Sequence, residues 1–280
     1  AWRNDVVNSD DYRAYVGGTS GLIYGYVNDG FYTVADFESF DSKSRTWKLK
    51  EGVVDSSPLS DTPRPGNAKF KKLTPVDPNS TNPYQLTEAD RTVIGNTTPK
   101  FSGGFGLNAT YKGFDMSMFF NFMYDFDVLN ANKIMLTTWA DNKENNFLMD
   151  IASDKRWRNF DDMGNEIRYS PEVLAEFNKN ATMWNPTSIG RPICMSYAVE
   201  DGSFLRLNSA TLGYTLPSVW TKKVGLSKVR FYVSGNNLFT LTGYSGYDPE
   251  VNIATGLTPN IDYNRYPRSR TYTFGAQLTF

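Results

Sequence analysis

The sequence predicts an all-β fold built from long antiparallel strands, and three observations support this prediction. The last eleven residues, 270–280, alternate strictly between apolar and small polar side chains, which is the period of a β-strand. Aromatic residues make up 15% of the chain, yet the mean hydropathy is only -0.47. The connections between predicted strands are either short or very long. Transmembrane β-barrel strands show all three features, but a soluble β-sandwich also has alternating strands, so both remain open.

The C-terminal strand has the length and the side-chain pattern of a membrane-crossing strand. Small polar residues such as Thr273 and Gln277 occupy one face, and aromatic or aliphatic residues occupy the other. A strand of about ten residues is long enough to cross the apolar core of a bilayer. In a barrel, we therefore expect four residues of the apolar face to contact lipid: Tyr272, Phe274, Leu278 and Phe280.

Four earlier segments show the same alternation. Residues 101–111 and 114–124 flank the short turn Lys112-Gly113, which predicts a tight hairpin. In residues 203–215, Leu205 and Leu207 are out of phase with the apolar residues that follow, so we expect a bulge near Asn208. Residues 228–241 alternate without interruption at their start.

The lengths of the connections predict which segments share an end of the sheet. Counting strands back from the C-terminus, the turns 112–113 and 216–227 lie at the same end of the sheet as the C-terminus. The second turn should hold one helical turn, with Pro217 at the first helical position and Gly225 as its stop. The long segments fall on the opposite side. If the C-terminus is periplasmic, residues 1–98 are an extracellular loop region, and residues 99–280 are C-terminal β-barrel strands with long extracellular loops at 125–202 and 242–269.

Composition argues against several function classes. The net charge of -1 gives no basic surface for nucleic acid, and the absence of histidine removes histidine-dependent catalysis. Cys194 lacks a partner base, and the neighbouring acids Asp161 and Asp162, or Asp248 and Glu250, are interpreted as solvated surface carboxylates. We therefore expect no enzymatic activity. The chain starts at Ala1 without a signal peptide, which favours a part of a longer chain.

Several motifs together resemble one protein family. The runs SFLRLNSATLGYTLP, LSKVRFYVSGNNLFTLTGYSGYDPEV and YPRSRTYTFGAQLTF resemble the C-terminal third of the SusC/RagA family of TonB-dependent outer-membrane transporters. Further matches are Tyr24-Gly25-Tyr26, Pro65-Gly66 and the run ADRTVIGNTTPKF. The motifs occur in the order and spacing of the family and cover nearly the whole chain.

The resemblance implies a barrel of about 22 strands with an N-terminal plug in the bacterial outer membrane. It also implies energy supplied through TonB and a SusD-like surface lipoprotein that delivers oligosaccharides or peptides. The plug and the TonB-binding segment have no counterpart here, so residues upstream of Ala1 would supply them and the rest of the barrel. The alternative is a surface carbohydrate-binding or hydrolytic β-protein without a channel.

One departure from the family concerns metal binding. Members often carry an acidic DxNGDG stretch before the DRTVIG motif, which suggests calcium ligands. Here the glycine with its flanking aspartates is missing, and Asp77, Asn79, Glu88 and Asp90 are the remaining oxygen donors. Asp90 is better interpreted as a turn or cap residue. We predict no metal and no cofactor.

Aromatic and charged residues in the long loops are the candidate ligand contacts. Such rings stack on sugar faces, and the polar groups bind hydroxyls. Packing of the loops' own small cores is the alternative role for each of them. The candidates are Trp139, Trp157, Trp184, Tyr244, Tyr247, Asp248, Tyr263 and Arg265.

Overall fold

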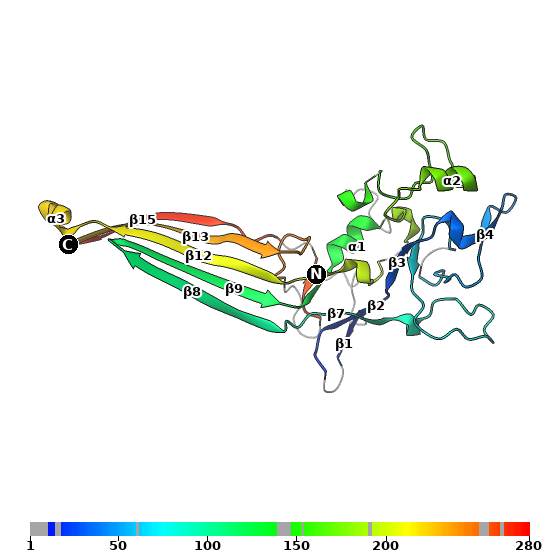
Figure 1. The fold of residues 1–280 in the computed structure, drawn as a ribbon, viewed down its shortest axis with the longest axis horizontal. Coiled ribbons are helices and arrows are strands. Elements are labelled where there is room, and N and C mark those ends of the chain that lie inside the picture. Colours follow the sequence, from blue (N-terminus) through cyan, green and yellow to red (C-terminus); the bar gives the residue numbers. More distant parts are fainter. Residues whose placement is uncertain are drawn as a thin grey trace.

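The protein is elongated, with one long sheet at one end and a folded assembly of short strands, helices and loops at the other (Figure 1). The computed structural model describes residues 11–14, 18–59, 62–138, 147–152, 154–189, 192–251, 258–263 and 266–280. The assembly of short elements, here called the loop region, comprises the described residues of 11–98, 125–203 and 243–270. The C-terminus and helix α3 (Ser218–Thr221) lie at the far end of the long sheet.

The long sheet has five antiparallel strands in the order β15-β13-β12-β9-β8. The strands predicted from the alternating pattern are all present, and each boundary lies within one residue of its predicted position. Their bounds are β8 Phe101–Tyr111, β9 Phe114–Tyr124, β12 Phe204–Thr215, β13 Lys228–Thr242 and β15 Thr271–Thr279.

The predicted bulge in β12 is confirmed. The register with both neighbouring strands shifts between Leu207 and Ser209. Because of this extra residue, Leu207 opposite Phe120 and Leu212 opposite Met116 lie on the same face of the sheet. A strand without the bulge would turn one of the two apolar pairs to the polar face.

The turns at the C-terminal end follow from local backbone preferences. Lys112 and Gly113 both have positive φ, as a tight hairpin turn requires, and a Cβ on Gly113 would lie 2.9 Å from the Thr215 carbonyl oxygen. The second turn holds α3 and the 3-10 helix η7 (Lys222–Val224), and it ends at left-handed Gly225 as predicted. Pro217 was predicted at the first helical position, but it is the residue before the helix, because its ψ of 135° is extended.

The loop region contains four small sheets and several short helices. The first sheet is β1-β2-β7, the second β11-β10-β14, and β3-β6 and β4-β5 are pairs. The strand bounds are β1 Tyr12–Arg13, β2 Leu22–Gly25, β3 Asn28–Phe31, β4 Phe37–Asp41, β5 Thr46–Leu49, β6 Ala68–Phe70, β7 Thr92–Asn96, β10 Asp127–Asn130, β11 Val199–Asp201 and β14 Ile261–Asp262. The helices are α1 Ala131–Thr137, α2 Pro171–Phe177, η2 Val34–Asp36, η3 Glu88–Asp90, η4 Met149–Ile151, η5 Pro186–Ser188 and η6 Ser196–Ala198.

Apolar cores join segments of the loop region that are far apart in the sequence. One buried cluster combines Phe70 and Leu86 with Trp184 and Met195. A second cluster combines Ile23, Leu129 and Ile261 and so includes all three long segments. The long segments are therefore one packed body rather than separate loops. Among the described residues, no helix is long and apolar enough to cross a bilayer.

Candidate functional site

One face of the long sheet is a continuous apolar surface. The register aligns Ala109, Met116, Leu212, Val233 and Phe274 in one row across all five strands. Phe274 is 81% exposed, and the other predicted lipid contacts, Tyr272, Leu278 and Phe280, are also exposed. Such a surface is far larger than the isolated apolar residues common on soluble proteins, so it marks an interface with lipid or with another apolar layer.

The opposite face is polar and closely packed. Arg230 reaches across β12 to form an ion pair with Asp115. Gly213 lies beneath it, and a Cβ there would be 2.4 Å from the Arg230 guanidinium. Tyr232 covers Gly275 in the same manner, at 2.3 Å. The glycines on this face therefore make room for large side chains from the neighbouring strand.

Arg206 ties the polar face of β12 to the segment that follows β13. Its guanidinium pairs with Asp248, and its Nη1 lies 3.7 Å from Glu250 Oε2. Arg268 pairs with both acids, with Nη2 3.1 Å from Glu250 Oε1 and Nε 3.7 Å from Asp248 Oδ2. Two arginines and two carboxylates thus hold Asp248, Glu250 and Arg268 against the polar face of β12.

Glu200 forms a second polar junction beside this network. Ser245 donates to it from its backbone nitrogen at 2.9 Å and its hydroxyl at 2.8 Å, and Lys133 Nζ lies 3.3 Å away. Burial opposes ionisation of Glu200, but these hydrogen bonds and the lysine outweigh it and lower its pKa. The Tyr244 hydroxyl donates to Asp262 at 2.6 Å. Burial, followed by the nearby Asp262 carboxylate, raises the pKa of Tyr244.

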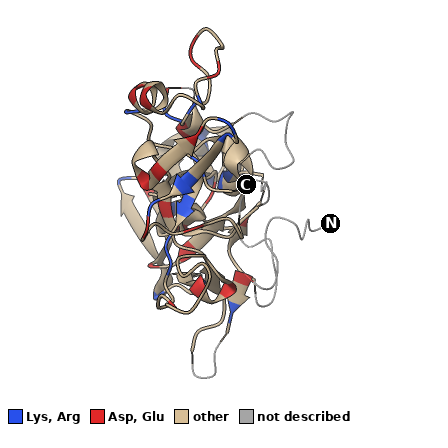
Figure 2. Cartoon of the chain, turned by 90° about the vertical axis from the view of Figure 1, so that its right-hand side faces the viewer, with Lys and Arg blue, Asp and Glu red and all other residues tan. Residues whose placement is uncertain are grey.

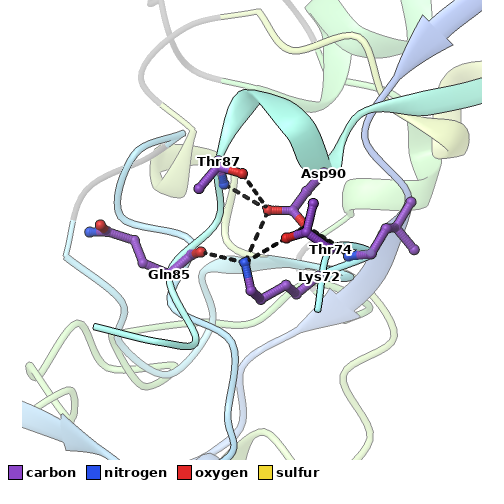
Figure 3. A network of polar contacts seen from close by, with 6 residues as sticks. Lys72, Thr74, Gln85, Thr87 and Asp90 are labelled. Atoms are coloured by element: carbon purple, nitrogen blue, oxygen red, sulfur yellow. Dashed lines mark hydrogen bonds and ion pairs between the residues drawn. The ribbon is translucent and has the colours of Figure 1, made fainter. Parts of the chain in front are cut away.

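Asp90 is the centre of a third network, shown in Figure 3. Its carboxylate accepts hydrogen bonds from the backbone nitrogens of Leu73, Thr74 and Thr87 and from both threonine hydroxyls, all within 3.0 Å. Lys72 Nζ lies 3.4 Å away. Burial opposes ionisation, but the hydrogen bonds outweigh it and hold the pKa of Asp90 well below its usual range. The predicted capping role is confirmed, since Asp90 and Thr87 form a capping box around η3.

A cavity of about 380 Å³ opens near α2 in the loop region. Three arginines and two aromatic residues contribute to its wall, together with amide and hydroxyl side chains. The lining residues are Arg156, Trp157, Arg158, Asn159, Phe160, Asp161, Arg168, Asn185, Pro186 and Thr187.

Known proteins show the same sequence pattern and the same fold. TonB-dependent receptor P3 of Formosa agariphila is 33% identical over 266 residues, which are 93% of this chain. TonB-dependent receptor SusC of Bacteroides thetaiotaomicron is 38% identical over 88 residues, which are 30% of this chain. A solved structure of the RagAB peptide transporter matches 94% of the chain with a TM-score of 0.57 and 22% identity. The chain is SusC/RagA-like. No family model matches it.

This SusC/RagA-like chain corresponds to only a part of those proteins. It spans 22% of the length of receptor P3, 8% of SusC and 23% of the RagAB chain. The predicted fold class, C-terminal antiparallel strands of a large barrel, is confirmed by the five-stranded sheet and its similarity to RagAB.

The predicted ligand contacts of the SusC/RagA-like chain lie in different environments. Trp157, Trp184, Tyr244 and Asp248 are buried, whereas Tyr247 is 79% exposed and Tyr263 is partly buried. Trp157 packs with Ile167 and Leu174, and Trp184 belongs to the Phe70 cluster. The structure does not gather the six described residues of this set into one site. Trp139 and Arg265 lie outside the described residues, and ligand contact by any of the eight stays a prediction.

Sequence reasoning missed Arg156, Arg168 and Arg206. A partner for Arg206 could have been predicted, because a charged residue on the polar face of a strand usually has a partner when it is buried. No sequence feature distinguishes Arg156 and Arg168 from ordinary surface arginines.

Other candidate chemistries have structural explanations. Cys194 is buried, and burial raises the pKa of its thiol. Hydrogen bonds from Asn165 lower the pKa of Asp161, which keeps it ionised. Asp77 accepts a hydrogen bond from the Asn79 backbone nitrogen at 2.9 Å, as in a turn. Within the described residues, no group of three or more acidic, histidine or cysteine side chains is arranged to hold a metal.

Proposed function

We propose that this chain forms the C-terminal barrel segment of a TonB-dependent outer-membrane importer of oligosaccharides or peptides. The observation that carries the proposal is the two-faced long sheet. Its apolar face suits lipid, and its polar face, with the Asp115–Arg230 pair, suits the interior of a plugged barrel. The relatives named TonB-dependent receptor and the RagAB fold support the same assignment.

The edges of the sheet require further strands. β8 and β15 each pair with one neighbour in the described part of the chain, so each offers a row of backbone donors and acceptors. A membrane cannot satisfy such an edge, because its interior has no hydrogen-bonding groups. We therefore assign the partner strands, the plug and the contact with TonB to the rest of the same protein.

The position of the loop region supports an extracellular role. The described residues of 11–98, 125–202 and 242–269 lie together at the end of the sheet opposite the C-terminus (Figure 1). With the C-terminus in the periplasm, this end meets the medium. We propose that a SusD-like lipoprotein and the incoming nutrient contact this surface.

The test uses the full-length protein in its native bacterium. Outer membranes are washed with high salt and then extracted with detergent, and uptake of the nutrient that induces the gene is measured in parallel with a TonB-deficient strain. An importer stays in the membrane until detergent is added and loses uptake without TonB. Release by salt alone, or uptake that does not depend on TonB, would favour a surface carbohydrate-binding or hydrolytic protein.

A further inference from the structure

The arginine-lined cavity is a hollow between segments of the loop region that are separate in the sequence. Residues 156–161 form one wall, Arg168 lies on the next turn of the chain, and the start of η5, from Asn185 to Thr187, closes the other side. Its volume of about 380 Å³ lies within the size range of small-ligand pockets, about 300–1,000 Å³.

The positive charge of the wall is only partly compensated. Arg158 pairs with Asp162 at 2.7 Å, and Arg168 pairs with Glu166 at 2.5 Å. Arg156 has no carboxylate partner among the described residues, and its guanidinium donates to the Ile151 carbonyl at a long 3.4 Å. At least one guanidinium at this cavity is therefore available to an anionic group.

A neighbouring hollow extends the same chemistry. It shares Asn159 and Arg168 with the cavity and adds Arg45 and Arg64. Arg45 lies 4.7 Å from the centre of the Tyr169 ring. Over the loop end as a whole, acidic and basic residues are interspersed (Figure 2). The concentration of arginines around these two hollows is thus a local feature.

The remaining polar groups of the wall also favour a ligand that accepts hydrogen bonds. Asp161, the only acid among the lining residues described, accepts from the backbone nitrogens of Met163 and Asn165 and from the Asn165 amide. Its oxygens are therefore occupied within its own turn. Trp157 is buried, and its Nε1 has no acceptor in the described part of the chain. The unpaired groups are donors, so the complementary ligand is rich in acceptor oxygens.

We propose that this cavity binds an acidic oligosaccharide through its carboxylate groups, an assignment of substrate class that rests on the proposed import function. Arg156 binds a carboxylate with two of its nitrogens, because a guanidinium matches two carboxylate oxygens at once. Arg168, whose Nε pairs with Glu166, contributes its two terminal nitrogens. The half-exposed Phe160 ring supplies an apolar surface for a sugar face, and Asn159, Asn185 and Thr187 supply partners for hydroxyls. This combination favours a sugar acid over an acidic peptide, whose extended backbone has no comparable flat face.

The experiment measures binding by purified full-length protein in detergent, using isothermal titration calorimetry. The probe is trigalacturonate, with uncharged trigalactose and triglutamate as comparisons. We expect binding of trigalacturonate that weakens with added salt, and a loss of at least about tenfold in affinity in Arg156→Gln/Arg168→Gln. Lys155→Gln removes the same charge one residue away from the cavity wall and should change the affinity less than about twofold. Arg156→Gln alone leaves the Arg168–Glu166 pair intact and serves if the double variant is unstable.

The outcomes separate this proposal from the proposed function. No binding of trigalacturonate by the wild type, or equal affinity in the wild type and both cavity variants, would overturn the site. Triglutamate that binds as tightly and is lost in the same variants would overturn the assignment to a saccharide. Binding in detergent needs neither TonB nor a membrane. A negative binding result therefore does not affect the uptake test of the proposed function, and a negative uptake result does not affect the measured affinities.

Discussion

Arg206 on β12 and Asp248 in the segment after β13 form an ion pair that is nearly inaccessible to solvent, with 2% and 9% of their side chains exposed. The pair Lys48–Glu38 on the β4-β5 hairpin is the opposite case, with 70% and 57% exposed. A buried charge needs an oppositely charged partner, because water cannot reach it to solvate it when the partner is lost. The first pair therefore fastens the loop region to the sheet, whereas the second contributes little.

Removing one partner of the buried pair should destabilise the protein strongly. We expect Asp248→Asn to lower the free energy of unfolding by up to about 3–5 kcal/mol, because the buried charge of Arg206 then keeps only the more distant Glu250 carboxylate, 3.7 Å away. Urea unfolding of the full-length protein in detergent measures the change. Glu38→Gln is the control and should cost about 0–1 kcal/mol. Equal losses in the two variants would show that burial does not determine the contribution of these pairs.

The orientation of β15 predicts opposite tolerances at neighbouring positions. Leu278→Arg should cost about 2–4 kcal/mol if the residue lies near the middle of the bilayer, because it places a charge in lipid. Thr273 lies on the polar face, so Thr273→Arg should cost much less. Unfolding of both variants in lipid vesicles provides the comparison. A larger cost at Thr273 would mean that the two faces of the sheet are reversed relative to the membrane.

The long sheet could be predicted from the sequence because the alternation of apolar and polar residues within each strand shows which face meets an apolar environment. An apolar residue at every second position fixes which side chains share a face, and the change of phase between Leu207 and Ala210 revealed the bulge. Pro217 was displaced by one position, because proline fits both the residue before a helix and its first turn.

The interior of the loop region could not be predicted in the same way. Trp184 and Tyr247 are both aromatic residues in long loops, yet one is packed in a core and the other is exposed. Their difference depends on partners such as Phe70 and Leu86, which lie about a hundred or more residues from Trp184 in the sequence. The Arg206–Asp248 contact likewise joins residues that no local pattern connects.

The network around Asp90 predicts a specific pH dependence. The pKa of Asp90 in the folded protein lies below its ordinary value of 3.8, since the hydrogen bonds outweigh burial. A depressed pKa stabilises the fold above the unfolded value, and this contribution disappears as pH falls below 3.8 toward the folded value. Asp90→Asn should therefore cost roughly 1.5–3 kcal/mol at pH 7. The difference between wild type and variant should stay constant from about pH 7 to 5 and shrink below about pH 4.

Unfolding in urea at several pH values tests this dependence. Asp77→Asn is the matched control, because Asp77 is an exposed turn residue of the same segment. A difference between wild type and Asp90→Asn that grows below pH 4 would contradict the role assigned to the ionised carboxylate.

Burial of Trp184 predicts a structural effect for its substitution. Its ring packs against Tyr197, with ring centres 4.8 Å apart, and its Nε1 donates to the Thr137 carbonyl at 3.2 Å. We expect Trp184→Ala to destabilise the loop region by about 3–5 kcal/mol, because it leaves a large cavity in a core. Limited proteolysis of intact cells should then cut residues of the loop region faster, while the barrel stays in the outer membrane. Unchanged proteolysis would exclude Trp184 as a core residue.

The exposed tyrosines Tyr247 and Tyr266 predict the opposite behaviour. The two residues are 79% and 89% exposed and belong to the loop region, where burying them on a partner gains apolar contact without disturbing a core. If this surface meets the SusD-like lipoprotein, Tyr247→Ala/Tyr266→Ala should weaken capture of the lipoprotein by about tenfold or more and leave the unfolding free energy within about 0.5 kcal/mol of the wild type. Trp220→Ala is the control, because Trp220 is an exposed aromatic residue in α3 at the other end. Co-purification of the lipoprotein from detergent-extracted outer membranes measures capture. If the double variant and Trp220→Ala capture equal amounts, these tyrosines do not belong to the partner surface.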